Sequence, residues 1–266
     1  TIDRVPPVGQ NTAMCLTRFA ETHIHAAISM PTAVGSPITR GIVDIREQNE
    51  VIARGCRDFP GVFPIGLALI EERFGKLGIE EAEKAMSELG LVGIVGHPPI
   101  AEWCIPFVEA AAAREGLVNL HMHNVLMDEI ATMFPHCTFI SHASTWGAEH
   151  LAKHDNVFFE VVQYPDGQGS EWDFAWFADK VGRERLIFGA DLPYYDYRVL
   201  QKTIEEAPID DDLKDRIAHK NLEALIQRFK PDWSMPEAPP KTVRVYDPEE
   251  LWAVNPENPV RLTVFA

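Results

Sequence analysis

Short apolar runs that alternate with stretches of helical periodicity are the feature of this sequence that most limits its fold. Seven runs are rich in β-branched and aromatic residues and almost continuously apolar, as expected of parallel strands buried on both faces. These runs span residues 25–30, 62–69, 91–96, 117–122, 137–141, 157–163 and 185–189. Because single helical stretches separate most of them, they predict βαβ units and hence a parallel sheet.

The helical stretches have recognisable ends. Residues 80–89 begin with acidic residues and stop at Gly90, and the Ala-rich residues 103–115 stop at Gly116, as helices commonly do. Residues 210–229 carry apolar side chains at helical spacing. No glycine-rich GxGxxG loop follows the first run, which favours a (β/α) barrel over a dinucleotide-binding open sheet. We therefore predict an α/β fold, a (β/α)8 barrel of the TIM type.

The chain divides into a predicted barrel domain, residues 1–229, and a C-terminal extension, residues 230–266. Seven of the 20 prolines lie in this Pro-rich extension, which has no helical period. Its apolar anchors, among them Trp233 and Trp252, predict that it packs on the barrel or on a neighbouring subunit, and packing on a neighbour predicts a homodimer. A flexible tail is the alternative.

Charge and cysteine content exclude several classes of protein. The 266 residues include 40 Asp and Glu against 24 Lys and Arg, for a formal net charge of -16. This acidic balance argues against nucleic acid and against anionic membranes, and leaves a small-molecule substrate as the expected partner. The four cysteines form no CxxC pair, and no apolar run approaches the about 20 residues of a membrane span. We expect a cytoplasmic protein with reduced thiols.

Polar side chains follow four of the predicted strands. His97, His121 and His142 end three successive strands, and Asp191 follows the last one. Active sites of (β/α) barrels lie at the carboxyl ends of the strands, so we expect these side chains to lie together. Imidazole and carboxylate groups at one mouth suit a divalent cation such as Zn²⁺, which would activate a bound water. His123, two residues after His121, is a further candidate for contact with substrate.

Four other histidines are predicted to be solvated, because they fall in a turn or on or near helices. They are His136, His150, His154 and His219.

Four segments carry a family resemblance through their order and spacing. They are GLVGIVGHPPI, ISHAS, RLIFGADLP and IAHKNLEALI, which begin at residues 90, 140, 185 and 217. Together they resemble the amidohydrolase superfamily, and within it the amidohydrolase-2 group of metal-dependent hydrolases and decarboxylases. That group includes the aminocarboxymuconate-semialdehyde and γ-resorcylate decarboxylases. The resemblance runs from about Leu16 to about Phe229.

The resemblance implies roles for individual residues. His121 matches the strand-five histidine of the family, often a metal ligand. His142 matches the strand-six histidine, which contacts substrate or the reacting water. Asp191 matches the strand-eight aspartate, which is a metal ligand and a proton acceptor. His97 falls where the family lines its pocket from strand four.

The sequence departs from the family at the first strand, which in the family ends in an HxH pair that supplies two metal ligands. The one HxH here is His23-Ile24-His25, and the residues after it resemble those after strand two in the family. In this register His23 and His25 lie at the amino end of strand two; the alternative is that they are the metal ligands. The first strand is then missing or atypical. Three explanations are open: an upstream segment absent from the sequence, loss of both strand and metal, or residues 260–265 in its place.

The implied function is a metal-dependent hydrolase that acts on a small organic substrate. Asp191 would take the proton of a metal-activated water, and His142 would stabilise the developing oxyanion. One alternative is a non-oxidative decarboxylase of a small aromatic or unsaturated carboxylic acid, in which Arg198 pairs with the substrate carboxylate. The other alternative is a metal-free, non-catalytic barrel, which the unmatched HxH motivates.

Overall fold

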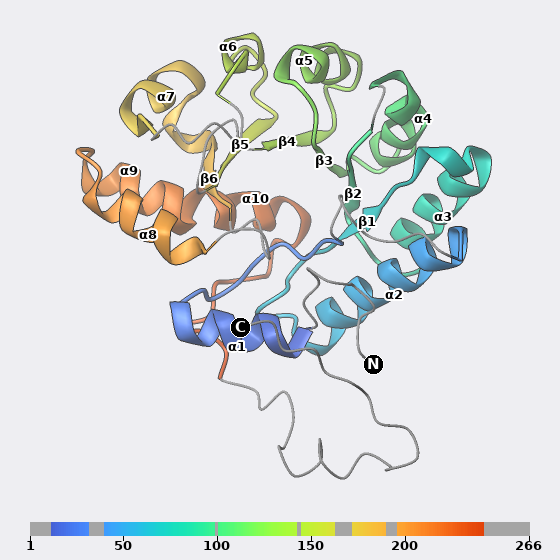
Figure 1. The fold of residues 1–266 in the computed structure, drawn as a ribbon, viewed down its shortest axis with the longest axis horizontal. Helices are drawn as coiled ribbons and strands as arrows, with labels where there is room; N and C mark the ends of the chain where they lie inside the picture. Colours follow the sequence, from blue (N-terminus) through green and yellow to red (C-terminus); the bar gives the residue numbers. More distant parts are fainter. Residues whose placement is uncertain are drawn as a thin grey trace.

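The computed structural model of the chain describes residues 12–31, 40–98, 101–142, 145–162, 172–189 and 196–241. Six parallel strands form one sheet, and their order across the sheet is their order in the sequence. The strands are Leu67–Leu69 (β1), Gly93–Gly96 (β2), Leu117–Leu120 (β3), Thr138–His142 (β4), Val157–Val161 (β5) and Leu186–Phe188 (β6). Figure 1 shows them as a curved wall with helices on its outer side. The predicted α/β fold with parallel strands is confirmed.

The first predicted run lies beside β1 as an extended segment. A parallel bridge joins Ser29 to Gly66, and the backbone N–H of Leu67 donates to the carbonyl of Ser29 over 2.9 Å. Leu67 also pairs with Gly93 of β2, so the segment occupies the other edge of β1. In the described residues each of the seven predicted runs therefore contains a parallel extended segment, although the first makes one bridge rather than a full ladder.

The helices follow the strands in alternation, as the sequence predicts. They are Thr12–Thr22 (α1), Ile42–Asp58 (α2), Lys76–Ser87 (α3), Ala101–Ala112 (α4), Asn124–Met133 (α5), Ala148–Leu151 (α6), Phe174–Val181 (α7), Tyr197–Glu206 (α8), Asp211–Asp215 (α9) and Asn221–Phe229 (α10). Short turns are Glu72–Phe74 (η1) and Arg183–Arg185 (η3), and a π-helical turn, Arg216–Lys220 (η4), joins α9 to α10. None of the described helices is both long and apolar enough to cross a membrane.

Alternate residues of each strand face two different apolar cores. Ile94, Phe139 and Phe159 belong to the core between sheet and helices, whereas their neighbours Val95 and Ile140 belong to the inner core. This two-residue alternation decides which later residues of each strand face inward. Gly93 marks a close approach between strands, because a Cβ atom there would lie 1.8 Å from the carbonyl oxygen of Leu117.

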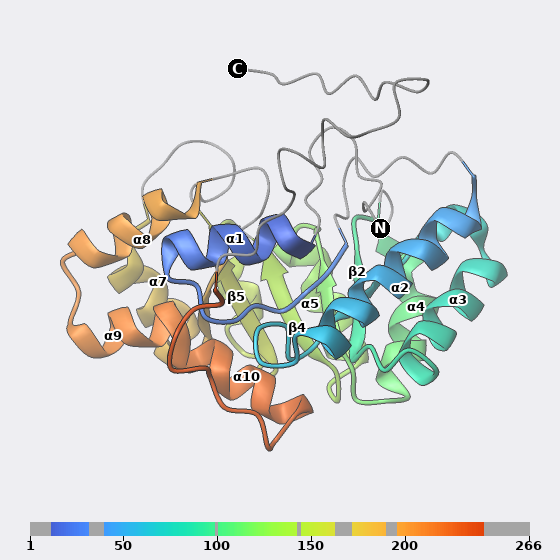
Figure 2. The same cartoon turned by 90° about the horizontal axis from the view of Figure 1, so that it is seen from below.

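The closing helix and the residues after it are fixed to the sheet by hydrogen bonds. The buried amide of Asn221 donates to the carbonyls of Arg183 and Leu186, at 2.7 and 2.8 Å. Trp233 is buried and its indole N–H donates to the carbonyl of Gly61. Figure 2 shows the chain after α10 running beside the segment that follows α1. Trp233 thus ties the residues after α10 to the barrel wall, and residues 242–266 lie outside the described part of the chain.

Candidate active site

Four polar side chains come together at the carboxyl ends of neighbouring strands. His97 directly follows β2 and His121 directly follows β3. His142 is the last residue of β4, and Glu160 lies within β5. Each stands two residues after an inward-facing position, so each faces the inside of the wall. His142 lies opposite Glu160 in the ladder between β4 and β5. The predicted meeting of the three histidines is confirmed, and Glu160 joins them.

The rings and the carboxylate form a contiguous row. The ring centroids of His97 and His121 are 5.8 Å apart, and those of His121 and His142 are 4.0 Å apart with nearly parallel planes. Nδ1 of His142 lies 2.8 Å from Oε2 of Glu160. His142 and Glu160 each keep 16% of their side-chain surface exposed. The imidazole of His142 and the carboxylate of Glu160 are therefore close enough to share or transfer a proton.

His121 is held neutral by its surroundings. Its pKa is lowered from 6.5 to about 3, mainly by burial and in smaller part by the neighbouring His142. A neutral imidazole has a lone pair available to accept a proton or to bind a cation.

Glu160 is held as a carboxylate despite its burial. Burial alone raises its pKa, but the adjacent His142 imidazole, by charge and by hydrogen bond, brings the pKa below its ordinary value. Nδ1 of His142 therefore donates to Glu160, which leaves Nε2 as the ring nitrogen not engaged by this carboxylate. Gly189, just after β6, makes room for the pair, because a Cβ atom there would lie 2.5 Å from Oε1 of Glu160.

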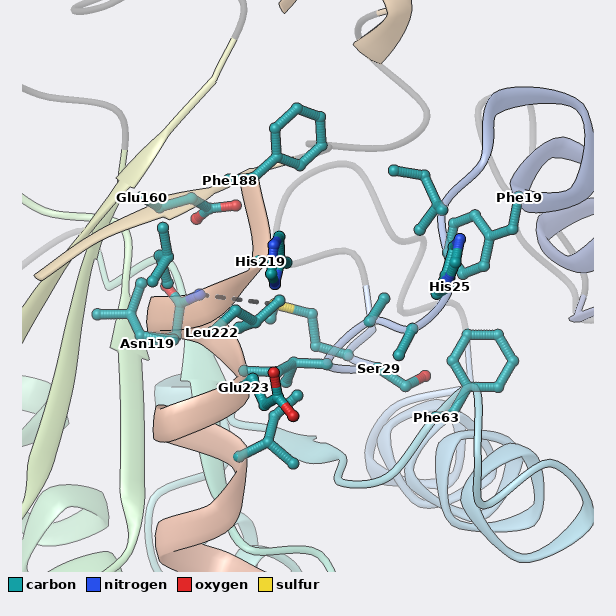
Figure 3. A pocket seen from close by; sticks show the side chains of 18 of the residues that line it. Phe19, His25, Ser29, Phe63, Asn119, Glu160, Phe188, His219, Leu222 and Glu223 are labelled. Atoms are coloured by element: carbon teal, nitrogen blue, oxygen red, sulfur yellow. Dashed lines mark hydrogen bonds between the residues drawn. The ribbon is translucent and has the colours of Figure 1, made fainter. Parts of the chain in front are cut away.

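The row lines one side of a cavity of about 940 Å³. Apolar side chains make up much of the rest of the lining, including Phe19, Phe63 and Phe188 (Figure 3). The opposite side comes from the segment after α1 and from the closing helix. No lysine or arginine is among the described residues that line the cavity.

The structure does not bring every predicted residue to the cavity. His123 is exposed at the start of α5, where its ring meets Trp146 edge-on at 5.6 Å. Arg198 is exposed on α8 and forms a 2.5 Å ion pair with Asp196, so its charge is engaged locally rather than in the cavity. Asp191 lies outside the described residues.

His23 and His25 precede the bridge at Ser29, which places them toward the amino ends of the strands, as the strand-two register predicts. Both line the cavity, and Nδ1 of His25 donates to the carbonyl of Pro236 over 2.8 Å. This hydrogen bond ties the first extended segment to the residues after α10.

Sequence reasoning missed Glu160 and misplaced two histidines. A charged residue inside the otherwise apolar run VFFEV was the available signal for Glu160. His154 is not solvated: Nε2 lies 2.6 Å from Oδ1 of Asp128, and only 13% of the side chain is exposed. His219 lines the cavity, and its Nδ1 is buried, because the π-helical turn carries it inward.

The donors in the described residues fit a cation only in part. Neutral His121 has the chemistry of a metal ligand. Nevertheless, no three His, Cys, Asp or Glu side chains in the described ranges are grouped closely enough to hold a metal ion. The rings of His121 and His142 are stacked at 4.0 Å, so their in-plane lone pairs run side by side rather than converging. A complete metal site needs donors beyond the described residues, such as Asp191.

Comparison with known protein families identifies the family to which this chain belongs. A family model described as amidohydrolase matches residues 19–227. The chain belongs to the amidohydrolase-2 family. The match covers the seven extended runs, the row of histidines and the closing helix, so the resemblance of the four sequence segments is confirmed. No curated protein sequence matches the chain.

Solved structures of amidohydrolase-2 proteins share the fold at low sequence identity. The 5-carboxyvanillate decarboxylase of Sphingomonas paucimobilis is 16% identical, with a TM-score of 0.64 over 80% of this chain and 82% of that chain. An amidohydrolase II structure is 14% identical, with a TM-score of 0.69 over 85% and 91%. The 5-carboxyvanillate decarboxylase of Novosphingobium aromaticivorans, which holds manganese, is 14% identical, with a TM-score of 0.64 over 80% of each chain. These likenesses establish the TIM-barrel architecture.

Proposed function

We propose that this amidohydrolase-2 enzyme is a metal-dependent decarboxylase of a small aromatic or unsaturated carboxylic acid. The observation that carries the proposal is the His142–Glu160 pair, 2.8 Å apart, at the rim of an apolar cavity. Non-oxidative decarboxylation replaces a carboxylate by a proton, so it needs a proton donor beside an apolar surface. The aromatic side chains Phe19, Phe63 and Phe188 offer a surface for an unsaturated ring.

The proton would come from Nε2 of His142. Glu160 accepts a hydrogen bond from Nδ1 and stabilises the positive charge of the imidazolium. Nε2 of His142 then donates its proton to the substrate carbon as the bond from that carbon to the carboxylate breaks, and carbon dioxide leaves. General acid catalysis of this kind contributes about 10²–10⁴-fold to a rate.

Two residues are proposed as holders of the divalent cation, His121 and Asp191. A cation held there would supply Lewis acidity toward the anionic oxygens of the substrate. The manganese in the Novosphingobium aromaticivorans decarboxylase supports a divalent cation in general. The sequence leads us to expect zinc. Metal analysis of the purified protein would show whether zinc or manganese is bound.

Hydrolysis by metal-activated water, which the sequence favours, is the second candidate. The neutral ring of His121 supports it, because this imidazole can accept a proton from water in the cavity. In that reaction Asp191 would be the principal proton acceptor and His142 the group that stabilises the oxyanion.

Product analysis separates the two reactions. The protein is loaded with Zn²⁺ or Mn²⁺, or treated with chelator, and incubated with hydroxybenzoic and unsaturated acids and, separately, with esters and amides. We expect metal-dependent release of carbon dioxide that His142→Gln abolishes and the exposed control His123→Gln leaves intact. Hydrolysis without carbon dioxide release would favour the second candidate, and a protein without bound metal or either activity would favour the non-catalytic barrel.

The surroundings of the enzyme are proposed from the sequence alone. We propose a small-molecule substrate, a cytoplasmic location and a homodimer. Light scattering of the purified chain gives the mass of the assembly and tests the dimer directly.

A further inference from the structure

The cavity has a second polar region, which lies toward the amino ends of the strands from the row of histidines and extends to the closing helix. Asn119, His219 and Glu223 line it, from β3 and from the turn and helix that close the wall. Figure 3 shows the side chains of these three residues around the same cavity as Glu160. Asn119 is two residues before His121 on the same inward face, so it lies deeper along the strand direction than the histidine row.

Two of these side chains have buried atoms without a hydrogen-bond partner. Asn119 is 1% exposed, and its Oδ1 has no partner among the described residues. Nδ1 of His219 is likewise buried and unpartnered in the described part of the chain. Leaving such buried atoms unpaired is unfavourable, so a ligand that supplies their missing partners is favoured.

Glu223 adds a negative charge to the same region. It stands four residues after His219, and both residues line the cavity. None of the ion pairs between described residues includes Glu223, not even those of the neighbouring Arg216 and Lys220, and no lysine or arginine lines the cavity in the described ranges. The other acid in the lining, Glu160, is already paired with His142. Among the described residues, therefore, nothing balances the negative charge of Glu223, which favours a cation.

The π-helical turn explains why these groups face inward. Residues Arg216–Lys220 form the wider turn, and Asn221 directly after it is anchored to the carbonyl of Leu186 in β6. With Asn221 held on the sheet side, His219 and Glu223 fall on the cavity side. Single π-helical turns inside helices are frequent at functional sites.

We propose that Asn119, His219 and Glu223 bind a protonated amine of the substrate. All three offer acceptors, an amide oxygen, an imidazole nitrogen and a carboxylate, and a primary ammonium has three donors to match them. The substrate is then an aromatic or unsaturated acid that carries an amine at the end remote from its carboxylate. This inference rests on the proposed function, since it assigns that substrate's other end to the same cavity.

Direct binding of two matched probes tests the proposal without turnover. The probes are 4-(aminomethyl)benzoate and 4-methylbenzoate, which differ only in the ammonium group, and their affinities are measured by calorimetry on the metal-loaded protein. We expect the amine probe to bind the unaltered protein more tightly. We expect Glu223→Gln to weaken the amine probe about 10-fold and to leave the methyl probe unchanged, because one charge-assisted hydrogen bond is lost.

Further variants keep the result interpretable. His219→Asn is expected to weaken the amine probe selectively, and the exposed acid Glu205→Gln on α8 is expected to change neither affinity. Equal affinity for both probes, or equal weakening of both by Glu223→Gln, would overturn the proposal. A selective effect of Glu223→Gln in a protein that releases no carbon dioxide would support the amine site and refute the decarboxylase function.

Discussion

Replacing His121 by phenylalanine tests whether this imidazole is held neutral inside the folded protein. Phenylalanine keeps an aromatic ring against His142, from which the His121 ring is 4.0 Å distant, and removes the titrating nitrogens. In the folded chain burial lowers the pKa of His121 from 6.5 to about 3. The unfolded chain therefore binds a proton at this residue between these values while the folded chain does not.

The sign and size of the effect come from this difference. Where the unfolded state binds more protons, the free energy of unfolding rises with pH, so His121 reduces stability as the pH falls below about 6.5. Each pKa unit corresponds to about 1.36 kcal/mol. Between pH 7 and pH 5 the unaltered protein should lose about 2 kcal/mol of unfolding free energy through His121 alone.

Urea denaturation at several pH values, with chelator present, measures this loss. We expect His121→Phe to remove about 2 kcal/mol of the pH dependence between pH 7 and pH 5. The exposed His136→Gln serves as a control and should leave the slope unchanged. The reasoning would be refuted by parallel curves for His121→Phe and the unaltered protein, since the imidazole would then titrate alike in both states.

Three further substitutions test the site and the wall that carries it. Glu160→Gln should reduce carbon dioxide release about 100-fold with little change in KM, because the charge behind His142 is lost; unchanged kcat would exclude the pair from proton transfer. Gly189→Ala should displace the Glu160 side chain, whose Cγ would lie 2.4 Å from the added Cβ, and steady-state kinetics should show a smaller loss of the same kind. An effect of Gly189→Ala on KM alone would contradict this. Asn221→Ala removes two hydrogen bonds of a buried amide and should lower the free energy of unfolding by about 2–4 kcal/mol in urea denaturation; a loss below about 1 kcal/mol would show that water replaces the amide.

Much of the wall is predictable because its signal is local. Apolar runs of five to eight residues mark the strands, and glycines mark several helix ends, so all seven extended segments could be located. The same periodicity placed His97, His121 and His142 at strand ends. Because parallel strands end at one rim of the sheet, the fold itself brings the three together.

Glu160 was not predictable as a partner of His142, because their contact depends on the register between β4 and β5. The two residues are directly opposite one another in the ladder. A shift by one residue would turn Glu160 toward the outer helices, and crossover connections do not reveal the register from sequence.

His219 and Arg198 show two other limits of sequence reasoning. The sequence places His219 on a regular helix, whereas the π-helical turn changes the face on which it lies. Arg198 follows the last strand closely, but Asp196, two residues earlier, binds its guanidinium. Local hydrogen bonds decide both positions, and neither can be deduced from the alternation of strands and helices.

The strands lie in the sheet in the same order as in the chain, and this order affects how the protein can fold during synthesis. Each of the strands β2 to β6 can add to an edge that the preceding unit has already formed, and none must insert between two paired neighbours. The wall can therefore grow as the chain leaves the ribosome, one unit at a time. Among the described residues, the Asn221 amide that arrives with α10 supplies a hydrogen bond to the carbonyl of Leu186 in β6, the last strand of the sheet. Nascent chains that stop before Asn221 lack this hydrogen bond to the last strand, and an unpaired strand edge is prone to association with other chains.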